Sequence, residues 1–162
     1  MKAAIRSAFV AAVVAGALFV GVTAAGAGEV RWFSPCVDGT AETTAGPLTV
    51  SFGWATDLPQ RTQKFLEYQY VTYSVNGGTP TQTTVGDLTG WSAITQGVDG
   101  NGNTLYVTRW TSPVLANLAS GESATITMSL KTTKTVWDTD KVFYKAGTEL
   151  LGSFTTCTIT AS

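Results

Sequence analysis

The side chains that could carry chemistry in this chain are carboxylates, tryptophans and two cysteines, because the sequence contains no histidine. Without histidine there is no Ser-His-Asp triad, no histidine-activated thiol, and no zinc or copper site with histidine ligands. Carboxylate catalysis, as in glycoside hydrolases, needs two acids that face each other across a cleft. Asp138 and Asp140 would point the same way on a strand, but a solvated strand edge shows the same spacing. We therefore predict a protein that is not an enzyme and needs no cofactor.

Tryptophan is the one residue type present out of proportion to the size of the chain. The five tryptophans are Trp32, Trp54, Trp91, Trp110 and Trp137. Such rings fill the cores of small domains, and exposed rings on a β-sandwich can also stack on sugars. Trp54 alternates with apolar neighbours and is predicted to be buried, whereas Trp110 and Trp137 have polar or charged neighbours and are better candidates for exposed rings. Trp91, which follows a glycine, is assigned to neither class. The candidate ligand-binding residues are thus Trp91, Trp110 and Trp137.

The run "DGNGN" places Asp99, Asn101 and Asn103 at the spacing of the first three oxygen ligands in a calcium-binding loop. An EF-hand loop then requires a glycine and, at its last position, a glutamate, where this chain has Thr104 and Trp110. Glycine and asparagine are also the residues that a hairpin turn needs, because they tolerate a positive φ. The sequence favours a plain turn, with a weak calcium site as the alternative, and no other metal site is predicted.

Two cysteines, Cys36 and Cys157, lie far apart in the sequence. In an exported protein such a pair predicts a disulfide. A structural zinc site is disfavoured because two thiolates do not fill a tetrahedral shell and no histidine is present to complete it. Closing a loop of about 120 residues stabilises a fold by about 4–5 kcal/mol in the chain-entropy model.

The N-terminus has the layout of a secretory signal peptide. Lys2 and Arg6 give a positive start, an uncharged apolar run extends from Ala8 to Val22, and Ala25-Gly26-Ala27 supplies the small residues of a cleavage site. The alternative is an uncleaved membrane anchor, which is disfavoured because alanine and glycine dominate the run and are only weakly hydrophobic. We predict that residues 1–27 are a signal peptide and that the protein is secreted to the extracellular space.

The remaining residues, 28–162, are enough for one ordinary domain. Eight basic residues stand against eleven acidic ones in this part of the chain, a net charge of −3. The charges form no block of one sign, so neither a nucleic acid nor, after signal cleavage, a membrane is an expected partner.

Alternation of apolar and polar residues predicts an antiparallel β-sandwich. In "PLTVSFGWA" the inward residues are Leu48, Val50, Phe52 and Trp54; in "SATITMSLK" they are Ala124, Ile126, Met128 and Leu130; in "SFTTCTITA" they are Cys157 and Ile159. Further strands are expected in "EYQYVTYSV", with Val71, Tyr73 and Val75 on one face, and in "NTLYVTRWTS", with Leu105 and Val107 on the face opposite Trp110. Turn-forming segments rich in glycine and asparagine separate these runs.

One short helix interrupts the strands, at about residues 57–67. Thr56 or Asp57 could cap it, and Pro59 occupies a first-turn position. Phe65 and Leu66 fall on one side of this helix, and charged residues fall on the other. We predict that the helix crosses an end of the sandwich and plugs the core. The alternative is a binding role for its exposed face.

Several motifs resemble a recurring type of secreted bacterial protein with an immunoglobulin-like (Ig-like) β-sandwich. They are "FGWATD", "TQKFLEYQ" before a strand and "VNGG", "YVTRWTSPVLANLASGESATITMSL", and "GTELLGSFTTCTITAS", which together span most of residues 47–162. The resemblance implies an Ig-like fold, in which a Gly-Trp strand leads into a short helix with a Phe-Leu pair and a late cysteine ends the domain. It implies no function, because these proteins are uncharacterised. Relatives often carry an Asp-rich run before the last strand, where this chain has only Asp138 and Asp140.

Taken together, these features predict a secreted, non-catalytic β-sandwich that acts as a scaffold or interaction protein for an extracellular partner. One alternative is a carbohydrate-binding module that uses exposed tryptophans on a polysaccharide. Another is a proteinaceous inhibitor of a secreted hydrolase, which would need a rigid protruding loop such as residues 97–103 or 113–122.

Overall fold

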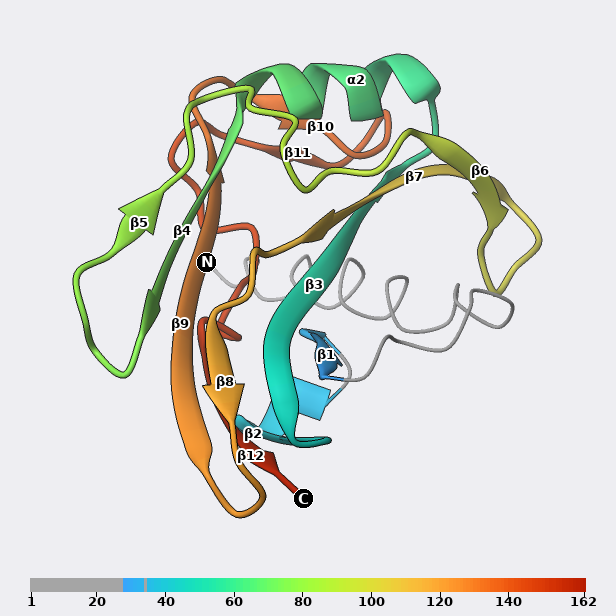
Figure 1. Ribbon diagram of the computed structural model, residues 1–162. Helices are drawn as coiled ribbons and strands as arrows, with labels where there is room; N and C mark the ends of the chain where they lie inside the picture. The colour runs from blue at the N-terminus through green and yellow to red at the C-terminus, as the bar shows by residue number, and fades with distance from the viewer. Residues whose placement is uncertain (1–27, 34) are drawn as a thin grey trace, which may run out of the picture.

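A computed structural model describes residues 28–33 and 35–162, so the predicted signal peptide lies outside the described residues. The described part is mostly β-structure with one short α-helix, and its two sheets pack face to face as an all-β sandwich (Figure 1). The predicted fold class is confirmed at this level.

The first sheet has the strand order β1-β3-β7-β6. Its strands are β1 (Glu29–Arg31), β3 (Gly46–Thr56), β7 (Thr104–Thr111) and β6 (Thr95–Val98), and β8 (Ala116–Leu118) pairs with the beginning of β3. The central pair, β3 and β7, corresponds to two of the runs in which alternation predicted a strand.

The second sheet has the order β2-β12-β9-β4-β5. Its strands are β2 (Thr40–Thr43), β12 (Thr156–Ala161), β9 (Ser123–Thr132), β4 (Gln69–Val75) and β5 (Thr81–Gln82). Its three central strands, β12, β9 and β4, are the other three predicted ones. A separate two-stranded hairpin, β10 (Val136–Trp137) and β11 (Phe143–Tyr144), lies close to the helix in Figure 1.

Two strand pairs are parallel rather than antiparallel. They are β1 with β3 and β2 with β12, whereas the remaining pairs among the described strands are antiparallel. The first three strands alternate between the sheets, so none of them is joined to its sheet neighbour by a hairpin. Their direction is therefore not imposed by a turn, and hydrophobic alternation does not report it.

The inward faces of β3, β9 and β12 are confirmed. Every residue predicted to point inward on these three strands is buried, from Leu48 on β3 to Ile159 on β12. On β4, Val71 is buried, while Tyr73 and Val75 are partly buried and pack against the same core. The core therefore lies between the two sheets, as the period of two requires.

The predicted orientation of β7 is wrong for its tryptophan. Trp110 is only 1% exposed, and Thr108 on the same face is equally buried. Phe52 lies directly opposite Trp110 in the β3–β7 register, and residues opposite each other point to the same face of a sheet. Thr108 is accommodated because its hydroxyl donates a hydrogen bond of 2.8 Å to the Ser92 carbonyl oxygen. Polar neighbours in sequence therefore did not mean exposure here.

The helix α2 (Pro59–Tyr68) crosses one end of the sandwich, at the top of Figure 1. Its buried residues are Thr62, Phe65 and Leu66, which confirms that it plugs the core. Pro59 occupies the first turn, but the N-cap residue is Leu58, without a side-chain cap. The expected cap at Thr56 or Asp57 is therefore wrong: the Thr56 hydroxyl bonds instead to the Thr62 hydroxyl, at 2.8 Å.

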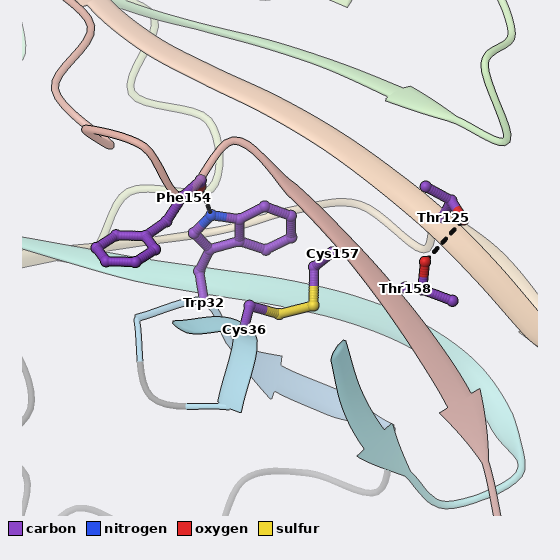
Figure 2. The surroundings of a disulfide bond; sticks show 6 residues. All are labelled: Trp32, Cys36, Thr125, Phe154, Cys157 and Thr158. Atoms are coloured by element: carbon purple, nitrogen blue, oxygen red, sulfur yellow. Dashed lines mark hydrogen bonds between the residues drawn. A yellow bond between two sulfur atoms is a disulfide. The ribbon is translucent and has the colours of Figure 1, made fainter. Parts of the chain in front are cut away.

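The disulfide between Cys36 and Cys157 is present, as predicted, with a Cα–Cα distance of 5.5 Å. It joins a short 3₁₀-helix, η1 (Pro35–Asp38), to β12. Figure 2 shows the fully buried Trp32 ring beside the bridge, where its indole N–H donates to the Phe154 carbonyl oxygen. The bridge thus fastens η1, which lies near the start of the described residues, to the last strand.

Candidate functional site: a cleft between the helix and hairpin β10–β11

On α2, a second row of side chains lies beside the row that is buried in the core. Gln60, Lys64 and Tyr68 are spaced four residues apart and therefore lie one above the other on the helix surface, with Arg61 next to them. These four side chains, together with the half-exposed N-cap residue Leu58, form one wall of a cleft of about 760 Å³. This volume is within the range of small-molecule sites.

The opposite wall comes from the segment that forms hairpin β10–β11. Val136, Trp137 and Asp140 line the cleft there, together with Thr135. Val136 is buried and Trp137 is 44% exposed, as alternation on a two-residue strand requires. The cleft therefore has a large exposed aromatic ring on one side, and on the other side polar helix side chains beside the apolar Leu58 and the Tyr68 ring.

Arg61 ties the two walls together. One of its terminal nitrogens, Nη1, donates to both carboxylate oxygens of Asp57, at 2.7 and 2.8 Å, and the other, Nη2, donates to Asp140. The Asp57 backbone N–H also donates to the Asp138 carbonyl oxygen, at 3.2 Å. The start of the helix and the turn of the hairpin are thus held in a fixed relation, so the cleft is preorganised.

Asp138 and Asp140 do not point the same way along a strand, because both lie in the turn between β10 and β11. The Asp140 side chain is 86% exposed at the cleft, whereas Asp138 is partly buried. Burial and then the negative charge of Asp57 raise the pKa of Asp138 to about 6, against the opposing effect of Arg61. Asp138 does not line the cleft, so the two acids do not face each other across it.

Tyr68 is flanked by two ammonium groups at the far end of the cleft. Lys134 Nζ lies 4.7 Å from the centre of the ring and Lys64 Nζ lies 5.7 Å from it. Lys64 also forms an ion pair of 2.7 Å with Glu67. Cations are attracted to aromatic faces at these distances. The Tyr68 ring is therefore already occupied by the protein's own cations.

The three candidate tryptophans are not brought together. Trp137 lines the cleft and packs on Phe143, its partner across the hairpin, with ring centres 5.0 Å apart. Trp110 lies in the core, so its assignment as an exposed ring is wrong. A buried ring cannot stack on a ligand, and Trp110 is therefore no longer a candidate. Trp91 is partly buried and packs edge-to-face against Phe52 and Phe65. Of the three candidate tryptophans, only Trp137 is exposed.

The loop from Asp99 to Asn103 has the geometry of a hairpin turn. The Asp99 carboxylate accepts hydrogen bonds of 2.8 Å from the backbone N–H groups of Asn101 and Asn103, and one of 2.9 Å from the Asn103 side chain. The Asn103 side chain, first among these donors, lowers the pKa of Asp99. Among the described residues, no group of three or more potential His, Cys, Asp or Glu ligands gathers.

The sequence did not identify the cleft, although part of its signal was visible. The four-residue spacing of Gln60, Lys64 and Tyr68 on the predicted helix marks one wall. The other wall depends on the hairpin around Asp140, and strands of two residues leave too short a pattern to be recognised.

Comparison with known proteins adds no relative to these observations. No protein-family model, no curated protein sequence and no solved structure matches the chain. In the part of the chain that the structure describes, no helix has both the length and the apolar character needed to cross a bilayer.

Proposed function

We propose that this protein is a secreted, non-catalytic binding protein with an Ig-like sandwich as its scaffold, and that it binds its partner in the cleft between α2 and hairpin β10–β11. The observation that carries the proposal is Trp137, a large ring that is 44% exposed and lines the cleft. Exposed tryptophans and arginines are the residue types that dominate binding energy at protein surfaces. The disulfide is compatible with an oxidising, extracellular environment.

The chemistry of the cleft favours binding over catalysis. Asp140 is the acid that lines it, and that carboxylate is paired with Arg61. A retaining or inverting glycoside hydrolase would need a second carboxyl group on the opposite wall, where the helix supplies Gln60 and Lys64 instead. Both cysteines are joined to each other, so neither is a thiol nucleophile.

The test is retention by immobilised protein of components from culture supernatant, beside pull-downs on insoluble cellulose, chitin and intact cell wall. We expect Trp137→Ala to lose whatever the wild type retains. Val85→Ala is the matched control, because Val85 is a similarly exposed apolar residue that does not line the cleft. Retention that is the same for the wild type and Trp137→Ala would contradict the proposed site.

The second candidate function is inhibition of a secreted hydrolase by loop 97–103. Its support is the rigid tip, where Asp99 holds three hydrogen bonds and Val98 is 56% exposed. The other loop considered, 113–122, is fixed instead on the sheet, because β8 within it pairs with β3. In this case Val98→Ala, rather than Trp137→Ala, would abolish binding to the enzyme.

A further inference from the structure

Two features of the cleft bear on the chemistry of its ligand: the kinds of side chain on its walls and the balance of their charges. Trp137 offers an apolar ring, backed by Phe143, while Gln60, Arg61 and Asp140 offer hydrogen-bond donors and acceptors. A saccharide has the matching surface, because its rings carry apolar C–H faces and its edges carry hydroxyl groups.

The charges around the cleft compensate one another. Arg61 is paired with Asp57 and Asp140, and Lys64 is paired with Glu67. The ammonium group of Lys134 lies over the Tyr68 ring. A strongly anionic or cationic ligand would have to compete with these contacts, and it would meet no net field of opposite sign. The charge balance therefore favours a neutral, polar ligand.

The Arg61–Asp140 pair is suited to recognise hydroxyl groups. Asp140 is 86% exposed, so its carboxylate retains acceptor capacity beyond the bond from Arg61. Arg61 is held by both Asp57 oxygens, and the guanidinium plane is therefore fixed before a ligand arrives. A hydroxyl can donate to Asp140 while its neighbour on the same sugar ring accepts from Arg61. Such preorganised partners cost little entropy on binding.

We propose that the cleft binds a neutral polysaccharide chain, with Trp137 stacked on one sugar ring and the Arg61–Asp140 pair hydrogen-bonded to that sugar's hydroxyl groups. This inference rests on the proposed function and names the ligand class of the same site. The cleft offers one exposed tryptophan, so binding depends on the polar pair as well as on the aromatic face.

The experiment is calorimetric titration of the protein with soluble cello-, chito- and manno-oligosaccharides, and with oligogalacturonate as the charged counterpart. We expect at least one neutral series to bind, with an affinity that changes little between low and high salt because no net charge is neutralised. Trp137→Ala should weaken this binding about thirtyfold, the loss typical of an aromatic hot spot. Trp137→Phe should restore part of it.

Two further variants separate the polar pair from nonspecific effects. Asp140→Asn keeps the shape of the side chain but weakens the acceptor, and should reduce affinity for the same oligosaccharide several-fold. Val85→Ala, outside the cleft, should bind like the wild type. Unfolding in urea should show a midpoint for Trp137→Ala close to that of the wild type, so that lost binding is not lost folding.

The outcomes distinguish this inference from the proposed function on which it rests. Binding of oligogalacturonate without the neutral series would overturn the inference, as would no binding of any saccharide while Trp137 is still required to retain a protein partner. In both cases the cleft would remain a binding site. If no ligand of any class depended on Trp137, the proposed function and the inference would both be wrong.

Discussion

At the scale of single residues, Trp110 and Trp137 show that strand pairing, and not the neighbours in sequence, determines whether a ring is buried. Both have polar or charged neighbours, yet Trp110 is 1% exposed and Trp137 is 44% exposed. Trp110 lies opposite Phe52 in a long pair of strands, with ring centres 5.2 Å apart, and is drawn into the core. Trp137 lies on a two-residue strand of a separate hairpin. Its ring stays partly exposed and lines the cleft.

The first prediction follows from these two environments. Trp110→Ala should lower the free energy of unfolding by about 3–5 kcal/mol, because it leaves a large cavity in a packed core. Trp137→Ala should change it by less than about 1 kcal/mol, since part of the ring is already in water. Urea unfolding followed by circular dichroism measures both. Equal midpoints for the two variants would show that Trp110 is not a core residue.

Asp138 carries a prediction about pH. Its pKa is raised to about 6 in the folded protein, first by burial and then by Asp57, from an ordinary value of 3.8. The folded state therefore holds this proton more tightly than the unfolded state. The stability that Asp138 contributes is fully present below about pH 4 and is lost as the pH rises through about 6.

The test compares wild type with Asp138→Asn across this pH range. The amide keeps the shape of the side chain but cannot ionise, so the variant should gain stability relative to wild type as the pH rises from about 4 to about 7. Asp87 and Asp99, whose pKa values are lowered, titrate in the same way in both proteins and cancel in the difference. A stability difference that is independent of pH would contradict the account.

At the scale of elements, one side of the helix α2 packs in the core and another side lines the cleft. Phe65 is fully buried and stacks on Trp54, with ring centres 4.5 Å apart, while Lys64, its neighbour in sequence, faces the cleft. A helix of ten residues is marginal alone, so packing of Phe65 and Leu66 supplies the stability that holds the other surface in place beside the cleft.

This division predicts opposite effects for adjacent residues. Phe65→Ala should cost about 3–5 kcal/mol in the free energy of unfolding, as expected for a buried aromatic ring. Lys64→Ala should cost no more than about 0.5 kcal/mol, because the Lys64–Glu67 pair is exposed. Urea titrations of the two variants provide the measurement. An unchanged midpoint for Phe65→Ala would mean that the helix does not plug the core.

The elements also show where prediction from sequence ends. The strands of six or more residues, and the inward faces of β3 and β9, follow from alternation because many buried residues repeat the signal. The short strands β10 and β11 cannot be predicted from alternation, and the parallel pairing of β1 with β3 cannot be predicted from it either. One wall of the cleft was therefore visible as a helix face, while the cleft itself was not. It exists only through contacts between residues such as Arg61 and Asp140, 79 positions apart.

At the scale of the whole molecule, residues near the start of the described part of the chain are fixed to distant parts of it. Arg109 on β7 pairs with Glu29 on β1 and donates to the Ser51 hydroxyl at 2.6 Å. Cys36 is bonded to Cys157 across 121 positions. These long-range links compensate for β1 and β2 being short strands of three and four residues. Among them, the disulfide closes almost the entire domain into one loop.

The last prediction concerns this bridge. The double variant Cys36→Ala, Cys157→Ala should lose about 4–5 kcal/mol of unfolding free energy in the chain-entropy model, because its unfolded chain is no longer restricted by a loop of about 120 residues. The loss appears as a lower urea midpoint than that of the non-reduced wild type.

A second measurement on the bridge uses the wild type alone. Cys36 is 1% exposed and Cys157 is fully buried, with the Trp32 ring beside the bridge, so a thiol reductant should reach the bridge only when the protein unfolds. Thiol labelling after exposure to dithiothreitol should therefore be slow in native buffer and fast in urea. Equal labelling rates in the two conditions would show that the bridge is accessible in the folded protein and that the N-terminal segment opens without global unfolding.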